Sequence, residues 1–253
     1  MKVAICQYDM SWEDAASNLR TVERLVERAD ADLVVLPEMF STGFKLHASV
    51  VAEPMSGPTI AAMREWSRRY GKAIVGSVVI VDDEGRFRNR QFFVKPSGEM
   101  TWYDKRHLFR PGGEGRDYTA GTERVVVEYG GVRFLLQVCY DLRFPVWSRN
   151  RGDYDAIIYS ASWAADRREA WRLLLRARAV ENQAFVLGVN RVGDDPSAHY
   201  AGDSAIVDFR GRTLCEAGDE EALLVCELDL QAMNRFRDAF PALQDADDFE
   251  IRI

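Results

Sequence analysis

The stretch FLLQVCYDLRFP, residues 134–145, joins an apolar run to a cysteine and then to a polar turn. The apolar half predicts a β-strand that ends at Val138, and Pro145 bounds the segment that follows. A residue at the end of a strand, just before a turn, is presented to a site. Cys139 is therefore a candidate nucleophile; the alternative is an unpaired thiol buried as a small hydrophobe.

Apolar strands alternate with helices on both sides of this stretch. The short apolar runs at 33–36 and 156–160 are typical of sheets that are covered on both faces. The predicted strands are 3–8, 33–36, 73–81, 86–95, 100–105, 124–129, 132–138, 156–160 and 184–190, with hairpin-like strands between about 203 and 228. The predicted helices are 15–29, about 60–70, one after Pro145, and 167–181. The first of them follows Ser11–Asp14, which resembles a capping box at its start.

Both halves of the chain repeat the same order of elements: strand, helix, strand, helix and then hairpins. No segment rich in Pro, Gly or Ser separates the halves. The pattern predicts a single α/β domain over residues 1–253, with two sheets and helices outside them. The tail at about 238–253 has no clear periodicity and is a candidate for packing on a neighbouring subunit.

Composition excludes several classes of function. The net charge is −7, and the basic residues are dispersed rather than clustered, which argues against a nucleic-acid or anionic-membrane partner. No run approaches the length of a membrane span, and the N-terminal run is too short for a signal peptide. The four cysteines are scattered, which favours free thiols and a cytoplasmic location. With three histidines and no CxxC pair, a zinc site is not expected.

Three reactive side chains follow apolar strands in the same way. Glu38 follows LVVLP, Lys105 ends MTWYDK, and Cys139 ends FLLQVC. Ligands bind beyond the carboxyl ends of parallel strands, so these groups are expected to converge. The carboxylate would take the thiol proton, and the ammonium would lower the thiol pKa and then face an oxyanion, with the N–H of Tyr140 as a second donor. In isolation, Glu38 could cap a turn and Lys105 could lie on a solvated face.

The motifs LPEMFSTGF (36–44), YDKRHLF (103–109) and VCYDLRFP (138–145) together resemble the nitrilase, or carbon–nitrogen hydrolase, superfamily. The resemblance implies an αββα four-layer sandwich, two sheets packed face to face with helices outside, assembled as homodimers or higher oligomers through the outer helices. It implies Glu38 as general base, Lys105 as oxyanion-stabilising group and Cys139 as nucleophile. Glu114 falls at the position of a second glutamate that many members use; the alternative is a solvated loop residue.

Within the superfamily, the segments 103–109, 139–150 and 176–193 are similar to bacterial omega-amidases, also called 2-oxoglutaramate amidases. The resemblance implies hydrolysis of the terminal amide of 2-oxoglutaramate or 2-oxosuccinamate through a cysteine thioester, with no cofactor. Other carbon–nitrogen hydrolases remain rivals: a carbamoylase, an aliphatic amidase or a nitrilase. A further alternative, from outside the enzymes, is a non-catalytic dimeric scaffold.

Substrate recognition has several candidates. A 2-oxo acid carries a carboxylate, which a guanidinium binds bidentately. Arg143 is the first candidate, against a structural salt bridge, and Arg191 is a weaker one. Phe44 and Trp163 are expected to wall the pocket, although aromatic residues are more often plain core.

His107 stands two residues after Lys105, so in extended chain both point to the same side. This makes a Cys–His mechanism the natural rival to the glutamate base. A histidine on the surface, or one that supports the site from behind, is the preferred interpretation, because Glu38 already fills the role of base.

Overall fold

The apolar run at 33–36 forms an inner strand of the first of two six-stranded sheets in the computed structural model, which describes residues 1–253. This strand, β2 (Leu33–Val35), pairs in parallel with β1 and β3. The order of the sheet is β14-β1-β2-β3-β4-β5. Its other strands are β1 (Lys2–Gln7), β3 (Ala73–Val81), β4 (Phe87–Val94), β5 (Met100–Asp104) and β14 (Ala222–Glu227).

The stretch at 134–145 supplies β7 (Val132–Val138) of the second sheet, which pairs in parallel with β8 (Ala156–Ser160). The order of this sheet is β13-β12-β9-β8-β7-β6. Its remaining strands are β6 (Val126–Tyr129), β9 (Phe185–Val189), β12 (Ala205–Val207) and β13 (Thr213–Glu216). A separate hairpin, which the sequence did not predict, pairs β10 (Val192–Asp194) with β11 (His199–Ala201).

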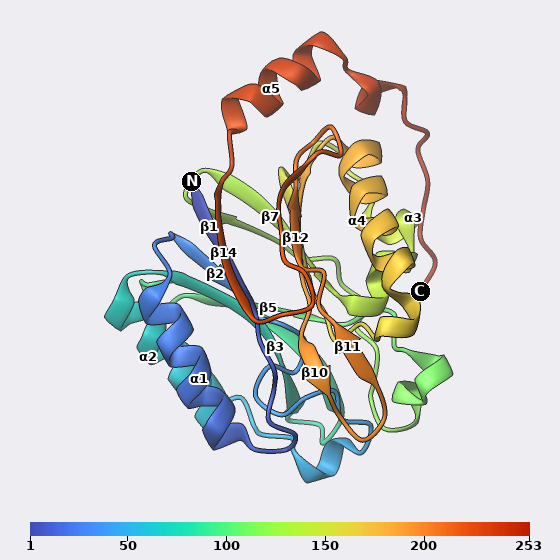
Figure 1. Cartoon of the computed structure of the whole chain (residues 1–253). Helices are drawn as coiled ribbons and strands as arrows, with labels where there is room; N and C mark the ends of the chain where they lie inside the picture. Colours follow the sequence, from blue (N-terminus) through green and yellow to red (C-terminus); the bar gives the residue numbers. More distant parts are fainter.

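Helices cover the outer face of each sheet, as Figure 1 shows. The helices are α1 (Ala15–Arg28) and α2 (Pro58–Tyr70) on the first sheet, and α3 (Pro145–Ser148) and α4 (Arg168–Asn182) on the second. Alternation along β1 places Val3 and Ile5 in the core between the sheets, and Ala4 and Cys6 against α1 and α2. The predicted αββα sandwich is confirmed. Each fully buried aliphatic side chain contributes about 1.5–3 kcal/mol to such a core.

The start of α1 differs from the predicted capping box. Asp14, the last residue of that box, is itself the N-cap, and its carboxylate accepts the N–H of Ser17 at 2.9 Å. Ser11 is instead tied to the side chain of Asn18 through its backbone N–H and C=O. The box was therefore wrong in register, because aspartate is one of the strongest N-cap residues and contributes about 1 kcal/mol.

Strand β14 does not close a hairpin with β13 in one sheet. It pairs antiparallel with β1, from Lys2 opposite Glu227 to Gln7 opposite Ala222. Figure 1 shows the late strand β14 beside the first strand of the chain. The expectation of consecutive hairpins over 203–228 is wrong at this point, because pairing with β14 covers the open edge that β1 would otherwise expose.

A fifth helix, α5 (Leu230–Ala239), was not predicted. Asp229 caps it by accepting the N–H of Ala232 at 2.9 Å, and Met233 is buried against the main core. The spacing of Leu230, Met233 and Phe236 was the available signal. Three large apolar side chains in a ten-residue segment are few for a periodicity argument.

The C-terminal tail beyond α5 contacts its own chain. The guanidinium of Arg151 lies over the ring of Phe249 at 4.5 Å, and Ile251 packs against the main hydrophobic core. Contact of the tail with a neighbouring subunit stays a prediction.

Candidate active site

The three predicted catalytic side chains meet where both sheets present the carboxyl ends of their parallel strands. In the first sheet β5 runs in the same direction as β2 and β3, because β4 is antiparallel to both of its neighbours. Lys105 follows β5 directly, Glu38 lies three residues beyond β2, and Cys139 follows β7. The Nζ of Lys105 lies 2.8 Å from Oε1 of Glu38. The sequence placed these residues at strand ends, and the packing of the sheets brings them together.

Glu114 joins this group from the loop after β5. Its Oε2 lies 2.8 Å from the Nζ of Lys105, so the ammonium bridges two carboxylates. Gly113 has φ +89°, a left-handed conformation that glycine adopts without a steric penalty, and it turns the loop inward just before Glu114. The N–H of Phe109 donates to the same carboxylate. All three charged groups are fully buried.

Two polar residues that the sequence analysis missed hold Glu38. The side-chain amide of Asn89 donates to Oε1 of Glu38 at 2.8 Å and to Oε1 of Glu114 at 3.0 Å. The backbone N–H of Ser162 donates to Oε2 of Glu38 at 2.9 Å. Asn89 and Gln91 lie two residues apart on the inner face of β4, and both are buried. Buried polar residues on a strand were the only sequence signal that could have indicated a functional role for Asn89.

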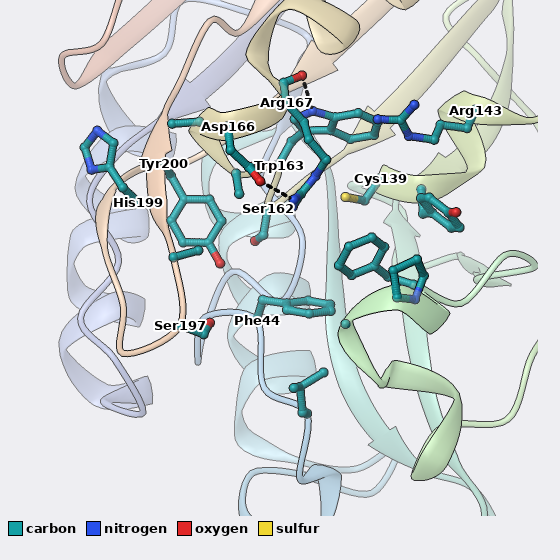
Figure 2. Close-up of a pocket in the computed structure, with 18 of the residues that line it drawn as sticks. Phe44, Cys139, Arg143, Ser162, Trp163, Asp166, Arg167, Ser197, His199 and Tyr200 are labelled. Atoms are coloured by element: carbon teal, nitrogen blue, oxygen red, sulfur yellow. Dashed lines mark hydrogen bonds and ion pairs between the residues drawn. The ribbon is translucent and has the colours of Figure 1, made fainter.

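Cys139 directly follows β7 and is the first residue of a 3-10 helical segment, Cys139–Arg143, so the chain turns sharply at this residue. Its backbone has φ +45°, which is uncommon for a residue with a side chain. The turn lifts the sulfur out of the sheet toward a cavity, and Figure 2 shows the sulfur directed into it. Cys139 is 7% exposed and packs at the edge of the main hydrophobic core, but unlike a plain small hydrophobe it also lines the cavity.

Burial sets the proton affinities of the site. It raises the pKa of the Cys139 thiol well above its ordinary value, and the carboxylate of Glu38 adds to this, while Lys105 only partly opposes it. Lys105 does lower the thiol pKa, as expected, but burial and Glu38 together raise it by more. Cys139 is therefore a thiol at neutral pH and needs a base to become a nucleophile.

Glu38 is suited to that role. Burial raises its pKa above the ordinary carboxyl value, Lys105 opposes this, and the negative charge of Glu114 raises it further. Burial alone would lower the pKa of Lys105, but Glu114 and Glu38 outweigh it and raise that pKa above its ordinary value. The lysine accordingly stays charged, and the glutamate has an increased affinity for a proton.

A cavity of about 580 Å³ opens above the sulfur. The four predicted substrate-binding residues, Phe44, Tyr140, Arg143 and Trp163, all line it together with Cys139. The guanidinium of Arg143 lies 4.9 Å from the ring centre of Trp163 and forms no ion pair with a carboxylate, so the alternative of a structural salt bridge does not hold. Figure 2 shows Arg143 and Trp163 side by side above Cys139.

Parts of the cavity wall were missed by sequence reasoning. Arg167 and Asp166 form an ion pair at 2.7 Å in the loop between β8 and α4. Ser197 and Tyr200, from the β10–β11 hairpin, line the side nearest Phe44. These segments are far from the catalytic motifs in the chain, and no local pattern links them to the site.

Two other candidates lie outside the cavity lining. Arg191 is fully buried and donates to the carbonyls of Val192 and Met10 and to Asp9. It is structural, and its interpretation as a carboxylate ligand was wrong. His107 faces Asp141, with 2.8 Å between its Nδ1 and Oδ1, and has no contact with Cys139 or Glu38.

The chain has no cluster of three or more His, Cys, Asp or Glu side chains that could hold a metal ion. None of its helices combines the length and apolar character needed to cross a membrane. All four cysteines are free.

Comparison with known proteins gives consistent matches over nearly the whole chain. Residues 2–238 match the family described as carbon–nitrogen hydrolase. The chain is 47% identical over 252 residues to omega-amidase YafV of Yersinia enterocolitica, covering 98% of both chains. It is 32% identical over 249 residues to the 2-oxoglutaramate amidase of Bacillus subtilis, covering 96% of both.

Solved structures agree. The chain superposes on XC1258 of Xanthomonas campestris, a CN-hydrolase superfamily protein with an arsenic adduct in its active site, with a TM-score of 0.97. The two are 42% identical, and the match covers 100% of this chain and 99% of the other.

Proposed function

The chain belongs to the carbon–nitrogen hydrolase family, and from that premise we propose that it hydrolyses the terminal amide of short 2-oxo dicarboxylate monoamides, such as 2-oxoglutaramate and 2-oxosuccinamate. Relatives named omega-amidase and 2-oxoglutaramate amidase support an amidase that acts on carbon–nitrogen bonds other than peptide bonds. The observation that carries the substrate assignment is Arg143. It is a guanidinium without a carboxylate partner, on the wall of the cavity that also contains the sulfur of Cys139.

The first half of the reaction forms a thioester. Glu38 takes the proton of the Cys139 thiol, and the sulfur attacks the amide carbon. The carbonyl oxygen becomes an oxyanion, which the ammonium of Lys105 and the N–H of Tyr140 stabilise. The tetrahedral intermediate then collapses, its C–N bond breaks, and Glu38 returns the proton so that ammonia leaves.

The second half regenerates the enzyme. A water molecule gives a proton to Glu38 and attacks the thioester carbon, and collapse of this intermediate releases the 2-oxo acid and restores the thiol. We assign Glu114 to holding Lys105 and orienting this water, supported by its hydrogen bond to the ammonium at 2.8 Å. No cofactor enters either half.

The proposed substrate class is tested by comparing rates of ammonia release from different substrates. Ammonia release should be fastest with 2-oxoglutaramate and slower with an N-carbamoyl amino acid, an uncharged aliphatic amide or a nitrile. Preference for one of these would favour the carbamoylase, aliphatic amidase or nitrilase rivals. Absence of turnover and of any acyl adduct on Cys139 with every substrate would favour the non-catalytic scaffold.

We also propose that the protein is a cytoplasmic homodimer or larger homo-oligomer, paired through its outer helices. Leu173 and Val180 lie seven residues apart on α4, are 68% and 54% exposed, and form an apolar stripe on its outer side. Light scattering on the purified chain tests this: a monomeric mass at micromolar concentration would contradict it.

A further inference from the structure

A third buried carboxylate, that of Asp141, lies beside Glu38 and Glu114 and takes no part in the reaction above. Oδ2 of Asp141 accepts the backbone N–H of Val138 at 2.9 Å and the hydroxyl of Tyr103 at 2.8 Å. Oδ1 accepts the backbone N–H of His107 at 2.9 Å and lies 2.8 Å from Nδ1 of the same residue. With two donors on each oxygen, the carboxylate is saturated, although no lysine or arginine pairs with it.

These donors come from the two segments that carry the catalytic groups. Val138 immediately precedes Cys139 at the end of β7. The other two donor residues stand two positions before and two positions after Lys105, on the strand and loop that deliver the ammonium. One carboxylate thus connects the nucleophile of the second sheet with the lysine of the first.

The backbone at Cys139 needs such a restraint. Its φ of +45° lies in the left-handed region, where a residue with a side chain persists only if its surroundings enforce that conformation. The hydrogen bond from the N–H of Val138 to the side chain of Asp141 closes a loop around Cys139. The other oxygen of Asp141 fixes this loop against the segment of Lys105.

His107 is placed to support Asp141 and not to exchange protons with substrate. Its ring stacks on Phe144 with 3.8 Å between ring centres and 9° between planes. An imidazole with a proton on Nδ1 donates to Oδ1 of Asp141 in this arrangement. The ring is not among the groups that line the cavity.

We propose that Asp141 is a positioning residue that sets the distance between the sulfur of Cys139 and the ammonium of Lys105, with His107 as its hydrogen-bond donor. The proposal rests on the proposed function, in which these two groups act on one acyl carbon. It assigns no chemical step to either residue.

Two substitutions at one site separate the donor role of His107 from the role of its ring. His107→Asn keeps an N–H near the position of Nδ1 but loses the ring. His107→Phe keeps the stacking on Phe144 but loses the donor. If donation to Asp141 is what matters, the asparagine variant retains kcat within about threefold, and the phenylalanine variant loses on the order of 10-fold or more, the cost of one hydrogen bond to a charged group.

Asp141→Asn places an amide N–H₂ group where two N–H or O–H donors already point. It should therefore disturb the turn at Cys139 more strongly than either His107 variant does. We expect kcat for 2-oxoglutaramate to fall on the order of 100-fold, as for a displacement of about 1 Å, with little change in KM. The matched control is Asp155→Asn. Asp155 is also a largely buried carboxylate with several donors, from Arg133 and Arg237, but it precedes β8 at the end remote from the cavity.

The rate of alkylation of Cys139 by iodoacetamide, followed by mass spectrometry, is measured beside kcat, KM and the melting temperature of each variant. Alkylation needs no amide substrate, so it reports on the site even if wild type proves inactive toward keto-amides, a result that would contradict only the proposed function. The positioning role is supported if Asp141→Asn changes the alkylation rate and Asp155→Asn, with a comparable loss of melting temperature, does not. Equal losses in both His107 variants, or equal behaviour of the two aspartate variants, would overturn it.

Discussion

The floor and the mouth of the cavity are built on different principles. At the floor, Lys105 lines the cavity and pairs with Glu38 and Glu114 behind it, and all three side chains are fully buried. At the mouth, Arg143 and Arg167 are half-buried, and Arg143 has no anionic partner at all. The floor is complete before substrate arrives, so it suits a reaction that is the same for every amide. The mouth retains an unmatched charge, which a substrate carboxylate can match.

Removal of the nucleophile should have the largest effect. Cys139→Ala leaves Glu38 and Lys105 in place, yet without the sulfur no thioester forms. We expect kcat to fall more than about 10⁴-fold, measured as ammonia release from 2-oxoglutaramate. Activity within tenfold of wild type would mean that the floor is not the site of chemistry.

The second-largest effect is expected when the positive charge between Glu38 and Glu114 is removed. Lys105→Met removes the cation between two buried carboxylates, so we expect kcat to fall about 10³-fold and the free energy of unfolding to fall by about 3–5 kcal/mol. Because Glu38 and Glu114 then repel each other, their protonation should relieve the instability. The loss of melting temperature relative to wild type should therefore be smaller at acidic than at neutral pH, and a pH-independent loss would contradict this.

The pH profile tests the coupling between the two glutamates. Glu38 must be deprotonated to act as a base, and its pKa is raised above 4.5 by burial and, further, by Glu114. The acidic limb of kcat/KM should therefore lie above that value. Glu114→Gln removes the like charge and should shift the limb to lower pH, with kcat reduced on the order of 10–100-fold.

A matched control for this variant is Glu53→Gln. Burial also raises the pKa of Glu53, but this carboxylate accepts the N–H of Thr59 near the start of α2. It should leave the limb unchanged. A limb that moves equally in both variants would show that Glu38 does not set it.

The raised pKa of Glu38 also makes folding stability depend on pH. The folded protein binds a proton at Glu38 more tightly than the unfolded chain does. The contribution of Glu38 to stability is therefore present at low pH and is lost as pH rises from 4.5 through the raised pKa.

At the mouth, Arg143→Met should separate charged from uncharged substrates. We expect kcat/KM for 2-oxoglutaramate to fall about 10–100-fold, the value of hydrogen bonds to a charged group, with little change for butyramide. Arg143→Lys keeps the charge but loses the planar fork and its contact with Trp163, so its loss should be intermediate. Equal losses for both amides would remove Arg143 from carboxylate recognition.

The smallest effect is expected at the second arginine of the mouth. Arg167 already pairs with Asp166, and both side chains are at least one-third exposed. Such a pair contributes about 0–1 kcal/mol, so Arg167→Gln should change kcat/KM for 2-oxoglutaramate by less than about fivefold. A loss as large as that of Arg143→Met would assign the carboxylate to both guanidinium groups.

The parts of the site that were predictable lie next to strong local patterns. Glu38, Lys105 and Cys139 each follow an apolar strand, and strand ends can be located from hydrophobic runs. Asn89 and Ser162 touch the same carboxylate but lie inside a strand and beyond the end of another, in segments without a distinguishing pattern. Their role arises only when the two sheets are placed face to face.

The same limit applies to the fold. The order of strands and helices from β1 to β9 could be predicted from the periodicity of apolar residues, because each element buries a face whose spacing matches its own geometry. The strand that covers the edge of the first sheet could not be predicted. β14 pairs with β1 across more than 200 residues of chain, and nothing in the sequence of β14 selects that partner.

Sequence alone determined the succession of elements from β1 to β9, the reactive groups at three strand ends and the family they resemble, because each depends on neighbours along the chain. Tertiary structure decided how those groups are charged, which arginine lacks a partner and what restrains the turn at Cys139. Electrostatic energy depends on distance through space and on exclusion of water, and both arise only when remote segments pack against one another.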